Sequence, residues 1–335
     1  MRVVIVGAGA IGGWLGGGLA RAGHDVAFLA RGRTLAALNR DGLIVREGEK
    51  SAEYEVEASD DPAKLGACDF VVLALKGQDV AGVAPSLRPL LGPETAVVST
   101  MNGLPWWFLD GFGGPLAGQV LTSVDPKGAT LASIEGRRVI GGVVHGSTRL
   151  DAPGVVRIVK IDRLLLGEPD GEGSERLGAL AEAFARGDVP VVQTGNIRME
   201  IWAKLWGNMN LNPLSALSRG TMARMLGDKM LFGLAAGMMR EMDEVGARIG
   251  LKMTMTPDDR LAMAARLGDF KTSMLQDLEA DRPLEVEPLL GVVVEMADAL
   301  KLELPLCRGV LGTIRQLEVS RTMARQAKVT GGGAS

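Results

Sequence analysis

The sequence predicts an α/β fold in which an N-terminal, Rossmann-type doubly wound sheet is followed by an all-helical C-terminal domain. Three observations lead to this prediction. A glycine-rich turn joins a short apolar strand to a helix, strand-like and helix-like segments then alternate, and helical periodicity dominates from Asn196 onward. At 335 residues the chain is too long for one small core. We therefore expect domains at residues 1–195 and 196–329, followed by a disordered tail at 330–335.

The N-terminal turn has the pattern of a dinucleotide-binding loop. An apolar run from Val3 to Val6 leads into a Gly-x-Gly-x-x-Gly pattern, and an apolar, helix-prone stretch follows. The glycines let the backbone turn sharply and approach a pyrophosphate at the N-terminus of the helix. The pattern is weak alone, but a strand before it and a helix after it are the context that supports it. The alternative is a glycine-rich turn without a ligand. The residues expected to bind the cofactor here are Gly7, Ala8, Gly9, Ala10, Ile11 and Gly12.

The second strand indicates which dinucleotide is bound. Val26 to Ala30 form a second β run, and in an NAD enzyme an acidic residue near its end would bind the ribose 2′-hydroxyl. This chain instead has Arg31 and Arg33, and a guanidinium suits a 2′-phosphate. We therefore expect NADP(H), with Arg31 as the main contact and Arg33 as support. The alternative is that both arginines are solvated loop charges.

The remaining N-terminal elements alternate as a doubly wound sheet requires. Asp69–Leu75 and Thr95–Thr100 are unbroken apolar runs, typical of buried parallel strands, and Val80–Leu91 between them is a short helical segment. Further strand-like runs, a helix and a last strand follow, at Arg138–Val144, Val155–Val159, Leu164–Leu166, Ser174–Arg186 and Val189–Gln193. The C-terminal helices are expected at 197–217, 228–250, 257–267, 272–280, 286–301 and 305–325.

Composition excludes several classes of function. Hydrophobic residues make up 47% and charged residues 23%, a balance typical of globular proteins. The net charge of −3 gives no sign of nucleic-acid or anionic-membrane binding. Cys68 and Cys307 lie far apart without metal-ligand spacing, so we expect no metal site and a reducing cytoplasm. No secretory leader pattern opens the sequence.

The scarcity of histidine and tyrosine narrows the choice of proton donor. The chain has two histidines, His24 in a turn and His145 in a strand-like segment, and one tyrosine, Tyr54, in a polar segment. A general acid is therefore expected among lysine, aspartate and glutamate.

A polar stripe on one predicted helix is the first candidate for chemistry. Lys204, Asn208 and Asn212 are spaced at i, i+4 and i+8, so they lie on one face of a helix whose other residues are largely apolar. Buried polar side chains need partners, and a ligand is a natural one. The alternative is an exposed stripe on an amphipathic helix.

Four more residues stand where ligands bind or helices begin. Asn102 and Lys76 each follow a buried strand, at the carboxyl edge of the sheet where open α/β folds bind ligands. Ser273 begins a helix and is readily explained as an N-cap. Glu285 is readily explained as a surface acid before the next helix. Spacing alone therefore assigns no function to Ser273 or Glu285.

The chain resembles the ketopantoate reductase (2-dehydropantoate 2-reductase) family along almost its whole length. The resemblance is carried by the motifs Gly7-Ala-Gly-Ala-Ile-Gly12, Ala74-Leu-Lys76, Met101-Asn-Gly103, Trp202-Ala-Lys-Leu205 with Asn208 and Asn212-Pro213, and Ser273-Met-Leu-Gln-Asp277 with Glu285. The last two are the most specific.

This resemblance implies a role for each matching position. Lys204 falls on the proton donor, Asn208, Asn212 and Ser273 on substrate-binding positions, and Asn102 on a position that touches substrate and cofactor. Glu285 falls on an acid near the ribose and the substrate. Arg31 falls on the 2′-phosphate contact, and Ala129 on a backbone contact to the cofactor.

The implied activity is NADPH-dependent reduction of 2-dehydropantoate in pantothenate synthesis. An ammonium at Lys204 would stabilise the charge on the carbonyl oxygen and donate its proton. Two alternatives remain: a related reductase of another 2-oxo acid or an opine-type dehydrogenase, and a non-catalytic NADPH-binding sensor.

One segment departs from the family pattern. Small and polar residues are usual after Met101-Asn-Gly-Leu104, whereas this chain continues with Trp106, Trp107 and Phe108. This aromatic loop either reshapes the substrate pocket or serves packing or a dimer contact. If the loop reshapes the pocket, the substrate can differ from that of the family. A homodimer is plausible from the methionine- and leucine-rich helical half.

Overall fold

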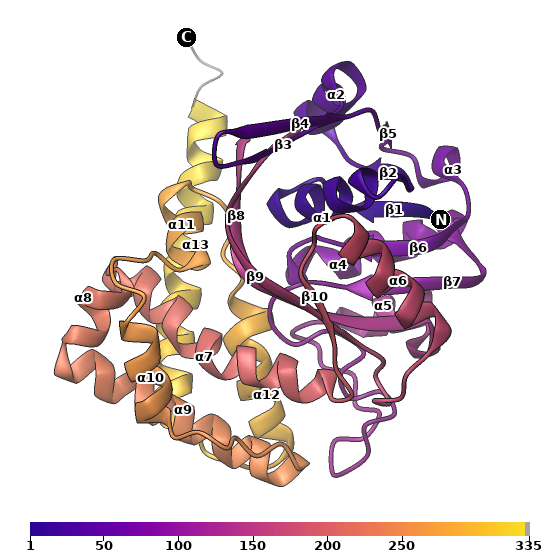
Figure 1. The fold of residues 1–335 in the computed structure, drawn as a ribbon. Helices are drawn as coiled ribbons and strands as arrows, with labels where there is room; N and C mark the ends of the chain where they lie inside the picture. Colours follow the sequence, from indigo (N-terminus) through magenta and orange to yellow (C-terminus); the bar gives the residue numbers. More distant parts are fainter. Residues whose placement is uncertain (332–335) are drawn as a thin grey trace. The chain divides into compact units, whose positions relative to one another are not determined.

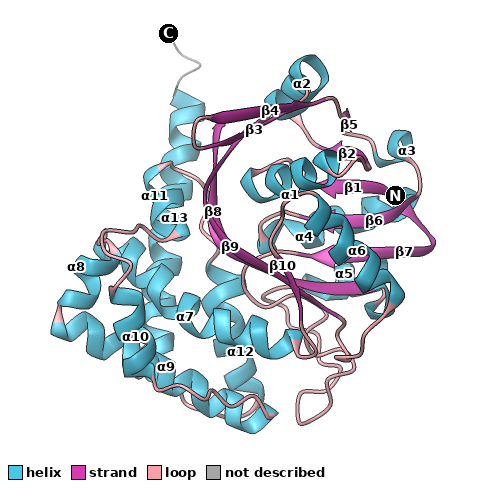
Figure 2. Cartoon of the chain, in the orientation of Figure 1, coloured by secondary structure: helices cyan, strands magenta, loops and turns pink. Residues whose placement is uncertain are grey.

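The computed structural model describes residues 1–331, and the chain divides into two compact units. The first unit comprises Met1–Phe112 and Gly118–Ile201, and the second comprises Gly113–Ala117 and the chain from Trp202 onward. The expected division at 195/196 lies within a few residues of the change of unit at Ile201, which falls inside helix α7 (Ile197–Ser218). Figure 1 shows the chain coloured by sequence, and Figure 2 shows its helices and strands.

The first unit is built on one mixed sheet, as expected for a Rossmann-type fold. Its order over the described residues is β4-β3-β9-β8-β7-β6-β1-β2-β5, with β10 paired to β9. The strands are β1 (Arg2–Val6), β2 (Asp25–Leu29), β3 (Leu43–Glu47), β4 (Lys50–Tyr54), β5 (Glu57–Ser59), β6 (Cys68–Leu73), β7 (Leu91–Ser99), β8 (Val139–Ala152), β9 (Val155–Gly167) and β10 (Val191–Gln193).

Along the sheet, the neighbouring strands β5, β2, β1, β6, β7 and β8 all run parallel. The antiparallel pairs are β8 with β9 and β3 with β4. Three helices of this unit have ten or twelve residues, and the other three are shorter. They are α1 (Ala10–Arg21), α2 (Gly32–Asp41), α3 (Pro62–Leu65), α4 (Gly77–Val83), α5 (Ala129–Ser133) and α6 (Glu175–Arg186), with 3₁₀ turns at Ala84–Leu90, Pro126–Gly128 and Gly136–Arg138.

Helix α1 lies in the concave side of the curved sheet, where β8 and β9 arch around it (Figure 1). Glycine makes this close approach possible. A Cβ built at Gly13 would clash with Val156 of β9, and one at Gly17 would lie 2.6 Å from Val45 of β3. The apolar core of the unit, including Ile5, Leu15 and Phe28, is fully buried between helix and strands. This packing fixes the start of α1, and with it the glycine-rich loop.

The second unit is helical, as the sequence predicts. Its helices are α7 (Ile197–Ser218), α8 (Met222–Gly227), α9 (Lys229–Ile249), α10 (Pro257–Ala265), α11 (Ser273–Glu279), α12 (Val292–Ala299) and α13 (Pro305–Gly331). Met238, Met239 and Met242 are fully buried and fill the core of this unit, whereas Met230, from the same methionine-rich stretch, is 82% exposed. Within the described residues, no helix combines the length and hydropathy needed to cross a membrane.

Several elements differ from the sequence prediction. Strands β3, β4 and β5 were not expected. β4 and β5 lie at the ends of the sheet and carry polar or charged residues, and β3, between β4 and β9, has an apolar run of only three residues, Leu43–Val45. Two runs expected as separate strands, Val155–Val159 and Leu164–Leu166, form the single strand β9. The helix expected at 286–301 begins with a π-helical turn at Glu287–Gly291. Helix α13 extends to Gly331, into the expected disordered tail, and residues 332–335 lie outside the described residues.

Candidate cofactor-binding loop and active site

The glycine-rich loop has the shape of a cradle for a phosphate group. Gly7 adopts φ +99°, and a Cβ there would lie 2.8 Å from Leu75 Cδ2 and 2.9 Å from the carbonyl oxygen of Ala74. A Cβ on Gly12 would clash with the carbonyl oxygen of Gly7. At Gly9, the N-cap of α1, nothing lies within 4 Å of a Cβ position. The loop is thus tightly packed on its protein side and open at Gly9, which fits a pyrophosphate at the helix N-terminus.

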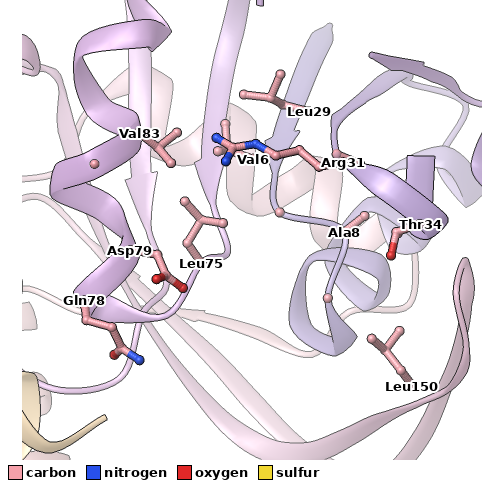
Figure 3. Close-up of a pocket in the computed structure, with 14 residues that line it drawn as sticks. Val6, Ala8, Leu29, Arg31, Thr34, Leu75, Gln78, Asp79, Val83 and Leu150 are labelled. Atoms are coloured by element: carbon pink, nitrogen blue, oxygen red, sulfur yellow. The ribbon is translucent and has the colours of Figure 1, made fainter. Parts of the chain in front are cut away.

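A cavity of about 650 Å³ adjoins this loop. Gly7, Ala8 and Gly9 line it at one side, and Arg31 and Thr34, from the start of α2, line it at another. Figure 3 shows the Arg31 side chain extended into the cavity. Apolar side chains such as Val6 and Leu29 of the strands form part of the remaining wall, and helix α4 adds the polar Gln78 and Asp79, so the space suits a nucleoside with its polar groups.

Arg31 and Arg33 have different surroundings. Arg31 is exposed, lines the cavity and has no carboxylate partner among the described residues. Arg33 is also exposed, but it is not among the residues that line the cavity. Of the two arginines, the structure therefore places only Arg31 at the cavity. The guanidinium of Arg31 remains available to a phosphate.

The other predicted cofactor contacts occupy loops and helix starts of the first unit. Lys76 is the N-cap of α4 and partly exposed, directly beside the cavity-lining Leu75. Asn102 lies just beyond the end of β7, partly exposed and next to Gly103, whose φ is +82°. Ala129 is the first residue of α5 and is partly exposed. Lys76 and Asn102 thus lie at the carboxyl ends of neighbouring parallel strands, where the sequence placed them.

Helix α7 carries the predicted polar stripe on a largely buried surface. Asn212 is 4% exposed, and Lys204 and Asn208 are partly exposed, whereas Trp202 and Trp206 are fully buried. The alternative of a solvent-exposed stripe is therefore wrong. Packing against the surrounding apolar side chains removes much of the water around Lys204.

Burial changes the proton affinity of Lys204. Loss of solvent lowers the pKa of Lys204 to about 8, and the negative charge of Glu285 opposes that fall. Glu285 is itself 8% exposed, just before the π-helical turn. The interpretation of Glu285 as a surface acid is therefore wrong. Lys204 and Glu285 form an electrostatically coupled pair within the second unit.

Ser273 does not cap α11. The cap is Thr272, whose side chain accepts a hydrogen bond from the Leu275 amide at 3.2 Å and also contacts the Ser215 hydroxyl of α7. Ser273 is the first residue of the helix and is exposed. The N-cap interpretation of Ser273 is therefore wrong, because its neighbour takes that position and leaves the Ser273 hydroxyl available to a ligand.

The aromatic loop is packed within the first unit. Trp107 Nε1 donates a 2.8 Å hydrogen bond to Ser99 Oγ, and a Cβ on Gly141 would lie 3.0 Å from the Trp107 ring. Trp107 and Phe108 are 1% and 0% exposed. Packing therefore accounts for both of these side chains. Trp106 is 7% exposed, and its indole nitrogen has no hydrogen-bond partner in the described residues.

Sequence reasoning missed the residue that anchors this loop. Arg198, at the start of α7, is 6% exposed and donates hydrogen bonds to the carbonyl oxygens of Phe108, Asp110 and Pro169. Its guanidinium carbon also lies 5.6 Å from the Trp107 ring centroid. No motif signals this role, because its partners are backbone atoms far away in the sequence.

Fold and site together define a Rossmann-type nucleotide-binding protein whose helical second unit carries a desolvated lysine coupled to a buried glutamate. The family model described as "Ketopantoate reductase PanE/ApbA" matches residues 3–171, and the model of its C-terminal domain matches residues 196–318. The chain belongs to the ketopantoate reductase PanE/ApbA family.

Individual relatives match nearly the full length. The chain is 43% identical over 323 residues to a 2-dehydropantoate 2-reductase of Mesorhizobium japonicum, covering 96% of this chain and 99% of the relative. A crystal structure from Ralstonia solanacearum MolK2, provisionally described as a ketopantoate reductase, superposes with a TM-score of 0.92 at 41% identity, covering 96% and 98% of the two chains. The crystal structure of a PanE/ApbA family ketopantoate reductase from Ralstonia eutropha JMP134 superposes with a TM-score of 0.81 at 28% identity. The match covers 96% of this chain and 100% of that chain.

Proposed function

We propose that this protein reduces 2-dehydropantoate to pantoate with NADPH, as a step of pantothenate synthesis. The observation that carries the proposal is Lys204 on the largely buried polar face of α7, electrostatically coupled to the buried Glu285. Membership of the family and the 43% identical reductase support the same reaction. A non-catalytic NADPH sensor has no need of a lysine with a lowered pKa, so this alternative is disfavoured.

NADP(H) fits the cavity of the first unit. The glycine-rich loop offers its open side at Gly9 to a pyrophosphate, and the guanidinium of Arg31, which has no carboxylate partner in the part of the chain that the structure describes, suits a 2′-phosphate. We assign Lys76, Asn102 and the backbone of Ala129 as further contacts, with Glu285 beside the ribose. When bound, NADPH supplies the hydride that adds to the substrate's ketone carbon.

Lys204 is the general acid in this proposal. Hydride addition places negative charge on the carbonyl oxygen, and the Lys204 ammonium stabilises this charge and then donates its proton to give the alcohol. A pKa of about 8 leaves the ammonium protonated at neutral pH yet ready to release its proton. Asn208, Asn212 and Ser273 supply neutral hydrogen-bond donors for the substrate's carboxylate and hydroxyl.

NADPH consumption by the purified protein tests the proposal. We expect fast turnover with 2-dehydropantoate and NADPH, and much slower turnover with NADH. NADPH binding without turnover of any 2-oxo acid would instead favour the sensor. Turnover of another 2-oxo acid, or of a 2-oxo acid together with an amine, in preference to 2-dehydropantoate would favour the related reductase or the opine-type dehydrogenase.

We also propose that the chain forms a homodimer in the cytoplasm. Met263, Leu267 and Phe270 are 51%, 57% and 40% exposed in the helical unit, which supports an apolar contact there. Cys68 and Cys307 are unpaired thiols, which suits a reducing compartment. Light scattering coupled to gel filtration measures the mass, and a monomer at micromolar concentration would contradict the dimer.

A further inference from the structure

Arg260 is a partly buried cation that the mechanism above does not use. It lies in α10, where burial lowers its pKa. Among residues 1–326, whose side chains the structure describes, its side chain forms no hydrogen bond or ion pair. The adjacent acids are engaged elsewhere, because Asp258 pairs with Arg240 at 3.2 Å and Asp259 accepts a 2.7 Å hydrogen bond from Thr256. A desolvated guanidinium without an anion is costly, which indicates that its partner is a ligand.

The guanidinium of Arg260 lies over Gly207 of α7. A Cβ built at Gly207 would be 3.1 Å from Nη2, 3.5 Å from Cζ and 3.7 Å from Nε of Arg260. Gly207 is buried, and glycine inside a helix is unfavourable compared with alanine. Its presence here gives the guanidinium room to pack against the helix backbone.

Gly207 belongs to the same helix surface as the proposed proton donor. It follows Lys204 by three residues, and residues at i and i+3 are neighbours on a helix. Arg260 therefore lies over the turn of α7 next to Lys204, on the side of Lys204 away from Asn208 and Asn212. The other residues assigned to the substrate, Asn208, Asn212 and Ser273, are neutral, so none of them balances the charge of a carboxylate.

We propose that Arg260 binds the carboxylate of the substrate and so restricts the enzyme to anionic 2-oxo compounds. This inference rests on the proposed reduction of a 2-oxo acid. A guanidinium binds a carboxylate through two parallel hydrogen bonds, which both hold and orient it. The carboxylate is adjacent to the ketone in such a substrate, so its fixation also sets the ketone's orientation toward Lys204.

The test compares an anionic substrate with its neutral counterpart. The wild type, Arg260→Met, Arg260→Lys and the control Arg266→Met are assayed with 2-dehydropantoate and with its neutral lactone. Arg266 is an exposed residue at the end of the same helix. We expect Arg260→Met to lower kcat/KM for 2-dehydropantoate about 10- to 100-fold, the range for charged hydrogen bonds, with little change for the lactone. Arg260→Lys should retain part of the activity, and Arg266→Met should resemble the wild type.

A second variant moves the guanidinium without removing it. In Gly207→Ala the new methyl group crowds Arg260, so we expect a selective loss for the carboxylate substrate here too. Calorimetric binding of pantoate and of neutral pantolactone gives a readout independent of turnover, and only pantoate affinity should fall. NADPH affinity and the melting temperature show that each variant is folded.

Two results would overturn the inference. One is an unchanged pantoate affinity in Arg260→Met, and the other is an equal loss for the anionic and neutral ligands, which would mean that Arg260 only covers Gly207. If the wild type fails to reduce 2-dehydropantoate, the proposed function fails. Selective loss of pantoate binding in Arg260→Met would still support an anion site in that case.

Discussion

Glu285 and the loss of solvent around Lys204 have opposite effects on the pKa of Lys204. Burial lowers the pKa of Lys204 to about 8, and the charge of Glu285 limits the fall. A lysine shifted further would be neutral at pH 7 and could donate no proton. A lysine at its ordinary pKa would hold its proton too tightly. The pair therefore keeps the ammonium protonated and reactive near neutral pH.

Removal of the Lys204 amine should abolish most of the catalysis. We expect Lys204→Met to lower kcat by roughly 100-fold or more, because the oxyanion then lacks both its stabilising charge and its proton donor. NADPH affinity should stay close to that of the wild type, as measured by fluorescence titration. A variant with near wild-type kcat would mean that another residue donates the proton.

The pH dependence of reduction should report the protonation of Lys204. Only the ammonium donates a proton, so kcat/KM should be constant at neutral pH and decrease as the pH rises through about 8. Glu285 raises the pKa of Lys204, so Glu285→Gln should move this alkaline limb to lower pH, whatever its effect on the maximal rate. A limb that stays in place or moves to higher pH in Glu285→Gln would contradict the coupling.

Cofactor preference should depend on Arg31 and not on Arg33. Arg31→Ala removes the guanidinium from the cavity, and we expect the KM for NADPH to rise about 10- to 100-fold, while the KM for NADH changes little. Arg33→Ala is the matched control, since this side chain does not line the cavity. If both variants changed the KM for NADPH equally, the 2′-phosphate would not bind specifically at Arg31.

Two glycines of the loop should respond differently to alanine. No protein atom lies within 4 Å of a Cβ at Gly9, so Gly9→Ala should preserve the melting temperature. NADPH affinity should fall, because the methyl group occupies the open side of the loop. Gly12→Ala clashes with the Gly7 carbonyl and should lower the melting temperature as well. Thermal unfolding and NADPH titration of both variants separate these effects. Full NADPH affinity in Gly9→Ala would argue against pyrophosphate binding there.

Arg198 should contribute strongly to stability. Arg198→Met leaves three carbonyl oxygens without their donor, and we expect the free energy of unfolding to fall by roughly 2–4 kcal/mol. Arg186→Met is the control, because its ion pair with Glu182 is exposed and should be worth less than about 1 kcal/mol. Urea unfolding measures both. Similar losses in the two variants would mean that the loop does not depend on Arg198.

The sequence predicted most regular elements because their signals are local. Gly7, Gly9 and Gly12 between a strand and a helix indicate the loop, and the apolar periodicity of residues 197–217 indicates α7. Edge strands such as β4 carry polar residues and depend on a neighbour for their hydrogen bonds, so no local pattern revealed them.

The sequence alone determined the fold class, the loop and the alignment of Lys204 with Asn208 and Asn212 on one helix face. Tertiary structure decided whether that face is buried, that Glu285 is buried and coupled to Lys204, and that Thr272 rather than Ser273 caps α11. It also placed Arg198 against backbone carbonyl groups, and Arg260 over Gly207, all far away in the sequence. Periodicity and turn chemistry are properties of neighbouring residues, whereas desolvation and charge coupling depend on which distant segments pack together.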